Sequence, residues 1–150
     1  MFESEMPPLD MIVRLLMAAG LAPLLWLERE LRGKPARLRS HMLVSVGASA
    51  FILIGLHILM TTAEGDPSAR IDPSRIVEGV IGGIGFLGAG CIIQGRGSVQ
   101  GITTGASIWI CGAIGVACGL GTLVLASMVT VLALIIMVVL GRFEREMIEE

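Results

Sequence analysis

Five stretches of this 150-residue chain are almost entirely apolar, and the polar residues gather between them. A membrane-spanning helix needs about 20 mostly apolar residues, within a range of about 17–25. The pattern therefore predicts an all-α membrane protein, a bundle of five transmembrane helices that forms a single transmembrane domain over residues 1–150. The predicted spans are residues 11–27, 42–60, 76–93, 102–120 and 122–140.

The composition supports a membrane location. Hydrophobic residues make up 54% of the chain and charged residues 16%, against about 25% charged residues in soluble domains. A net charge of −2 gives no general attraction for nucleic acid, so we expect no nucleic-acid partner. The three cysteines lie in apolar segments and fit small buried side chains better than a zinc site or a disulfide. We expect no metal and no cofactor.

The basic residues predict the orientation in the membrane. The segment 28–41 carries five of them and is placed in the cytoplasm by the positive-inside rule, whereas the bases of the segment 61–75 are balanced by acids. The N-terminus is then outside and the C-terminus cytoplasmic. The basic segment acts either as a collar that fixes this topology or as a docking surface for a protein or for anionic lipid headgroups. Its bases are Arg29, Arg32, Lys34, Arg37 and Arg39.

The third apolar segment is the most unusual because it is rich in glycine. In a bilayer, glycine allows neighbouring helix backbones to come close, so we predict helix packing along this segment. Three of its glycines also match the dinucleotide-binding pattern G-x-G-x-x-G, but no acid follows between residues 79 and 143 and no strand precedes it. We therefore exclude that function. The predicted packing positions here are Gly79, Gly82, Gly83, Gly85, Gly88 and Gly90.

The fourth segment continues the small-residue surface with Gly101 and Gly105, and it adds the hydroxyls of Thr103, Thr104 and Ser107. Such hydroxyls bond either to another helix or back to their own i−4 carbonyl. We expect the third and fourth segments to pack against each other along glycine. The fifth segment, rich in Val, Leu, Ile and Met, is expected to face lipid.

Charged residues near the spans are the candidates for function. Glu78 lies one turn inside the third span, where an acid is costly. It pairs either with Arg75 near the outer surface or, inside a polar cavity, with Arg14 or a cation. Arg14 either extends to the nearby surface or pairs with an acid within the bundle. Asp72 followed by Pro73 is typical of a helix N-terminus.

Five short motifs in order resemble the membrane domain of the MgtC/SapB family. The likeness runs from about Leu24 to Gly121, and it gives eight motif positions to which we assign no role. The motifs are Glu28-Arg29-Glu30, Leu38-Arg39-Ser40-His41-Met42-Leu43-Val44, Asp72-Pro73-Ser74-Arg75-Ile76, the run Gly83–Gly90, and Gly101-Ile102-Thr103-Thr104. The motif positions are Glu28, Arg29, Arg39, His41, Asp72, Arg75, Thr103 and Thr104.

The resemblance implies a multi-pass protein of the bacterial inner (cytoplasmic) membrane. It also implies a part in adaptation to low magnesium and in survival inside host phagocytes. The family's founding member resembles a regulator that restrains the proton-translocating ATP synthase, and it is associated with a P-type magnesium ATPase. This sequence departs from the family pattern at Trp26, Arg37 and Ser40, and it stops at Glu150, without the soluble C-terminal domain of many members. Functions that need that domain are not carried over.

Three functions compete on this basis. The first is a regulator that acts through membrane-helix contacts with a partner complex, supported by the glycine faces and the basic segment. The second is a transporter or channel for magnesium or protons, with Glu78, Arg14 and the hydroxyls from Thr103 to Ser107 along its path. The third is a homo-oligomer joined through glycine. The sequence shows no nucleophile paired with a base and no phosphate-binding loop, so we expect no enzyme.

Overall fold

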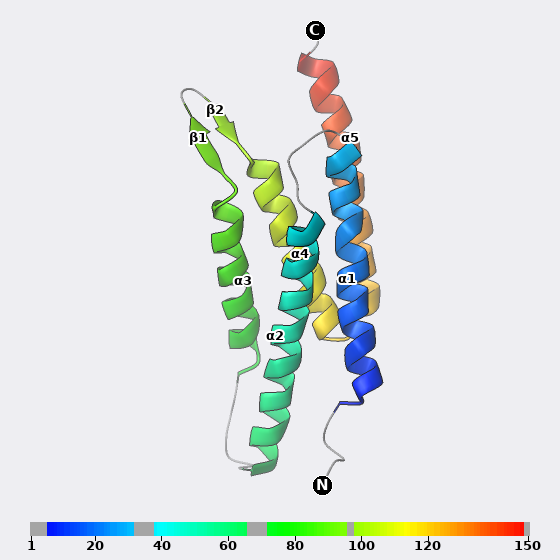
Figure 1. Cartoon of the computed structure of the whole chain (residues 1–150), viewed down its shortest axis with the longest axis vertical. Helices are drawn as coiled ribbons and strands as arrows, with labels where there is room; N and C mark the ends of the chain where they lie inside the picture. The colour runs from blue at the N-terminus through cyan, green and yellow to red at the C-terminus, as the bar shows by residue number, and fades with distance from the viewer. Residues whose placement is uncertain (1–5, 32–37, 66–71, 96–97, 149–150) are drawn as a thin grey trace.

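The computed structural model describes residues 6–31, 38–65, 72–95 and 98–148, which form five helices and one small hairpin. The helices run alternately up and down, and the two chain ends lie at opposite ends of the bundle (Figure 1). The helices are α1 (Pro8–Leu31), α2 (Leu38–Gly65), α3 (Ser74–Ala89), α4 (Ile102–Gly119) and α5 (Leu123–Ile148). Strands β1 (Ile93–Gly95) and β2 (Ser98–Gln100) lie between α3 and α4.

Within the described residues, four of these helices are long and apolar enough to cross a membrane. Their candidate spans are Pro8–Leu27, Leu38–Thr62, Ile102–Gly119 and Leu123–Phe143. These correspond to the predicted first, second, fourth and fifth spans. The chain is thus a helical membrane protein, while the side of the membrane on which each terminus lies stays a prediction.

The predicted third span, 76–93, is wrong in length. Helix α3 has only 16 residues and ends at Ala89, because the chain turns away there. The Gly90 N–H donates to the Phe86 carbonyl (3.0 Å) and the Cys91 N–H to the Gly88 carbonyl (3.1 Å), after which β1 begins. The two strands pair antiparallel over three residues each, from Ile93 opposite Gln100 to Gly95 opposite Ser98. The prediction of an all-α protein holds for the five helices but did not include this short hairpin.

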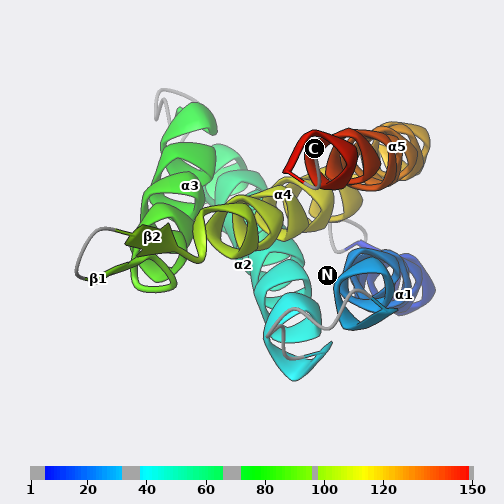
Figure 2. The same cartoon turned by 90° about the horizontal axis from the view of Figure 1, so that it is seen from above.

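Helix α4 lies at the centre of the bundle, with the other four helices around it (Figure 2). More than half of its residues are buried, and their small side chains let four neighbours approach; Cys111, Ile114 and Cys118 are close to fully buried. Helix α5 exposes most of its surface and buries mainly Ala126 and Thr130, as its aliphatic composition suggests. Trp109 on α4 remains 46% exposed.

Candidate functional site

Two glycines bring α3 and α4 into backbone contact. A Cβ placed on Gly105 of α4 would lie 2.7 Å from the carbonyl oxygen of Gly88 on α3, and a Cβ on Gly88 would lie 3.1 Å from the Gly105 oxygen. Further along, the side chain of Ile84 fills the space over Gly112. Because any larger residue at Gly88 or Gly105 would push backbone against backbone, this is where the two helices fix their distance.

Gly101 serves the turn between β2 and α4. Its φ of +86° lies in the left-handed region, and a Cβ there would collide with the carbonyl oxygen of Cys91. Gly90 meets only its own helix, since a Cβ on it would lie 3.3 Å from the Leu87 carbonyl oxygen. Of the predicted packing glycines, Gly101 therefore acts in a turn and Gly90 ends α3.

Four glycines of α3 have open space on the side where a side chain would stand. Among the described residues, no atom lies within 4 Å of a Cβ position on Gly79, Gly82, Gly83 or Gly85. Packing through these positions, against some other molecule, stays a prediction. They divide into two pairs, because Gly79 and Gly83 face toward α2 and line a groove, whereas Gly82 and Gly85 do not.

The groove lies between α2 and α3 and has a volume of about 800 Å³. Its side chains are apolar apart from one arginine, and several remain open to the surroundings, such as Leu43 (70% exposed) and Phe51 (61%). The two helices meet where the Ile76 side chain lies against Gly55. The lining residues are Leu43, Val44, Gly47, Ala48, Phe51, Ile54, Gly55, Ile58, Arg75, Ile76, Gly79, Val80, Gly83, Ile84 and Leu87.

Glu78 and Arg75 are both exposed in the first turns of α3, and the described residues contain no ion pair between them. The predicted i−3 pair is therefore not formed. Glu78 is also not paired with Arg14, which lies elsewhere in an ion pair of its own. Among the described residues, no cluster of three or more His, Cys, Asp or Glu side chains could hold a metal ion.

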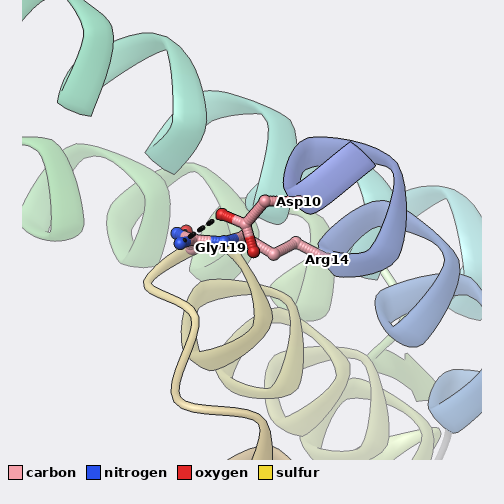
Figure 3. Close-up of polar contacts among 3 residues, drawn as sticks. All are labelled: Asp10, Arg14 and Gly119. Carbon is pink, nitrogen blue, oxygen red and sulfur yellow. Dashed lines mark hydrogen bonds and ion pairs between the residues drawn. The ribbon is translucent and has the colours of Figure 1, made fainter. Parts of the chain in front are cut away.

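Arg14 is partly buried at one end of the bundle, where it joins the first turns of α1 to the end of α4 (Figure 3). Its guanidinium donates from Nη1 to the Gly119 carbonyl (2.8 Å) and lies 2.6 Å from the Asp10 carboxylate, four residues earlier on α1. Only 16% of its side chain is exposed. Arg14 thus pairs with an acid, Asp10, but this acid is 41% exposed in the first turn of α1, so the pair lies toward the end of the bundle and does not decide between the two alternatives.

His41 is buried at the contact of α2 with α4. Its Nε2 lies 3.1 Å from Ser107 Oγ, and the Ser107 hydroxyl donates to the Thr104 carbonyl (2.8 Å). The Ser107 oxygen therefore lies within hydrogen-bond distance of both the His41 ring and the Thr104 carbonyl. The motif histidine and the hydroxyl segment are thus brought together, a pairing that the sequence could not show.

Two further serines follow His41 on the same face of α2. Ser45 and Ser49 are fully buried, and neither hydroxyl has a hydrogen-bond partner among the described residues. Their backbones pack tightly on α4, because a Cβ on Gly115 would strike the Ser45 carbonyl oxygen and one on Gly119 would lie 2.8 Å from the Ser49 oxygen. Sequence reasoning missed both serines, whose i, i+4 spacing from His41 was the available signal.

Asp72 lies two residues before α3, with Pro73 at the N-cap position that was predicted for Asp72. Its carboxylate accepts a hydrogen bond from the Ser74 N–H (2.9 Å). Two hydrogen bonds from Ser74 lower the pKa of Asp72. The side chain of Ser74 has the larger effect and its backbone N–H the smaller. The helix begins at Ser74, one residue later than Pro73 would suggest.

The other motif positions are spread over the bundle. Thr103 and Arg39 are exposed near the first turns of α4 and α2. Glu28 and Arg29 fall in the last turns of α1, and their side chains lie outside what the structure describes. Most of the basic segment, 32–37, also lies outside the described residues.

Comparison with known proteins gives a consistent result. A family model described as the MgtC family matches residues 15–146. The chain is 41% identical over 123 residues to Protein SrpB of Synechococcus elongatus, covering 75% of this chain and 65% of that protein. It is 40% identical over 119 residues to Protein MgtC of Salmonella typhimurium, covering 79% of this chain and 47% of that one.

A third relative is YhiD of Escherichia coli (strain K12), a candidate magnesium transporter by name. It is 35% identical over 128 residues, which cover 85% of this chain and 59% of YhiD. The chain thus spans about half to two thirds of the length of these curated relatives. No solved structure matches it.

Proposed function

This chain belongs to the MgtC family, and we propose that it is a regulator in the bacterial inner membrane that acts through helix contacts with another membrane complex. Its role would be adaptation to magnesium limitation and survival inside host cells. The ATP synthase and a P-type magnesium ATPase are the partners that the family resemblance suggests. The names of its relatives, MgtC and the candidate magnesium transporter YhiD, support the link to magnesium.

The observation that carries the proposal is a row of one acid and three small residues on a side of α3 that does not line the groove. Glu78, Gly82, Gly85 and Ala89 follow one another at spacings of four, three and four, so they share one face of the helix. We call these four residues the outward stripe. Three of them are exposed and Gly85 is half-buried, and both glycines are open to an approaching molecule.

The outward stripe has the chemistry of a helix-docking surface. In a bilayer, helices associate by close packing, and glycine and alanine let their backbones approach most closely. An acid beside such a surface is costly in lipid unless a partner supplies a base or a hydrogen-bond donor. A partner helix with small residues could pack closely against Gly82, and one basic side chain on it could pair with Glu78.

Purification of the tagged protein from gently solubilised membranes tests the proposal. We expect a membrane complex to be recovered in stoichiometric amount with the wild type and to be lost with Gly82→Leu, which fills the outward stripe. Gly83→Leu is the matched control, since the neighbouring glycine is equally open but faces the groove. Repeated recovery of the protein alone, or equal recovery with both variants, would refute the proposal.

A growth test connects this contact to magnesium. A deletion strain grown in limiting magnesium should be rescued by the wild type and by Gly83→Leu, but not by Gly82→Leu. Co-purification of two differently tagged copies of this chain, in place of another complex, would instead identify the outward stripe as a homo-oligomer contact.

A second candidate function is cation transport, which the name of YhiD and the acid of α3 favour. Purified protein in liposomes would then carry magnesium or protons, and Glu78→Gln would abolish that flux. Flux that is absent from the wild type, or that Glu78→Gln leaves unchanged, would remove this candidate.

A further inference from the structure

The groove between α2 and α3 has an apolar interior and one charged residue at its end. Arg75 stands in the first turn of α3, and from there the α3 wall continues through Gly79 and Gly83 to Leu87. A ligand that fits this pattern is an amphiphile with a long apolar chain and an anionic head. We propose that the groove binds an acyl chain of an anionic phospholipid, whose headgroup phosphate pairs with Arg75.

The length of the groove agrees with a lipid chain of one leaflet. From Arg75 to Leu87 the helix rises about 18 Å, at about 1.5 Å per residue. Half of a hydrocarbon core of about 30 Å is about 15 Å. A chain that starts with its headgroup at Arg75 would therefore end close to Leu87, the last α3 residue in the groove.

The groove has room for a lipid chain. A single chain of methylene groups can enter a volume of about 800 Å³ whose lining is apolar over most of its length. The room inside comes from three glycines, Gly47, Gly79 and Gly83, which have no atom within 4 Å of a Cβ position.

Charge on α3 also favours an anionic head at this end of the groove. Arg75 lines the groove, whereas Glu78 lies on the outward stripe and is not among the lining residues. The carboxylate of Asp72 accepts its hydrogen bond from Ser74. The guanidinium of Arg75 has no ion-pair partner among the described residues, and guanidinium binds phosphate oxygens with two parallel hydrogen bonds.

The test is a lipid-binding measurement on the purified, delipidated full-length protein. Phosphatidylglycerol or phosphatidylcholine is added back, and native mass spectrometry counts the lipid that each protein retains. The wild type should retain phosphatidylglycerol better than phosphatidylcholine. Gly83→Leu adds a side chain at a position that lines the groove and where a Cβ meets no atom within 4 Å, and it should lower retention of both lipids about tenfold.

Two further variants distinguish binding of the acyl chain from recognition of the lipid headgroup. Gly82→Leu carries the same side chain one residue away, outside the groove, and should retain lipid like the wild type. Arg75→Gln should still retain lipid but should no longer distinguish the two headgroups. Should Gly83→Leu misfold, Gly79→Leu fills the same groove from one turn away.

The outcomes that overturn the proposal are equally definite. They are equal retention by Gly83→Leu and Gly82→Leu, a preference for phosphatidylglycerol that survives Arg75→Gln, or a second copy of the chain in place of lipid. Inorganic phosphate at millimolar concentration should not displace the lipid, because most of the contact is with the acyl chain. The result is independent of the proposed function, whose test depends on Gly82 and on recovery of a partner.

Discussion

Replacing Gly115 by alanine should open a close contact between α2 and α4. The added methyl group would point at the backbone of α2, striking the Ser45 carbonyl oxygen and lying 2.8 Å from Ala48 Cβ and 2.9 Å from the Ser45 carbonyl carbon. A flexible side chain could rotate away, as Ile84 could at Gly112, but a helix backbone cannot. The whole of α2 must therefore shift away from α4.

The expected cost can be bounded from two opposing terms. Overpacking a well-packed contact costs about 1–3 kcal/mol, and contact with backbone belongs at the upper end. The change from glycine to alanine favours the helix by at most about 1 kcal/mol. The free energy of unfolding should fall by about 2 kcal/mol, which is a roughly 30-fold change in the ratio of folded to unfolded protein.

Unfolding by sodium dodecyl sulfate in mixed micelles, followed by fluorescence of the two tryptophans, measures this change. Gly47→Ala is the control, because no atom lies within 4 Å of the added methyl and the same helix-propensity gain applies. Its stability should equal or slightly exceed that of the wild type. Equal stability of Gly115→Ala and Gly47→Ala would refute the argument that glycine sets the distance between α2 and α4.

Three other changes test the polar contacts. Arg14→Gln removes the ion pair with Asp10 and a charge-assisted bond across helices, and should lower the free energy of unfolding by about 1.5–3 kcal/mol in the same assay; a loss no larger than that of Asp10→Asn would contradict this. Double-mutant analysis of His41→Ala and Ser107→Ala should give a coupling energy of about 0.6–1 kcal/mol, and strict additivity would argue against their hydrogen bond. Because the pKa of Asp72 is lowered in the folded state, its ionised form adds stability above the usual value of 3.8, and this is lost as the pH falls below it. Asp72→Asn should therefore flatten the acid limb of a plot of melting temperature against pH, and parallel curves for the two proteins would show that the carboxylate has no such effect.

Much of the helical plan could be predicted because long apolar runs carry a strong signal. Residues 42–60 and 123–140 form helices since a bilayer leaves the backbone no other way to satisfy its hydrogen bonds. The start of α3 could also be predicted, because Asp72 and Pro73 act locally. The apolar runs and the start of α3 could be predicted because each depends only on residues that are close in the sequence.

The end of α3 could not be predicted in the same way. Apolar character continues through Ile92 and Ile93, so hydropathy alone extends the span past Ala89. The hairpin has only three residues in each strand, too few for an alternating pattern to stand out. What fixes it is the left-handed turn at Gly101 against Cys91, a contact between residues ten apart.

The candidate sites could not be predicted because they depend on which neighbouring helix each residue faces. Composition identified the glycines of α3 but not that Gly88 meets α4, that Gly83 opens toward α2, or that Gly82 faces away. Similarly, the ion pair of Arg14 with Asp10 is a local i,i+4 contact, but its hydrogen bond to Gly119 joins residues more than a hundred positions apart. Contacts of this kind arise from the packing of whole helices and leave no local pattern.

The shortness of α3 affects the membrane itself. At about 1.5 Å per residue its 16 residues measure about 24 Å, less than the thickness of about 30 Å of a typical hydrocarbon core. On this flank, headgroups must sink toward the helix ends or the bilayer must become thinner, at a cost of a fraction of a kcal/mol for each ångström. The opposite flank, formed by the longer α1 and α5, imposes no such deformation. We therefore expect the bilayer to be thinner beside α3 than on the opposite side of the protein, so that thin bilayers, or neighbouring proteins that also thin the bilayer, would lower the elastic energy.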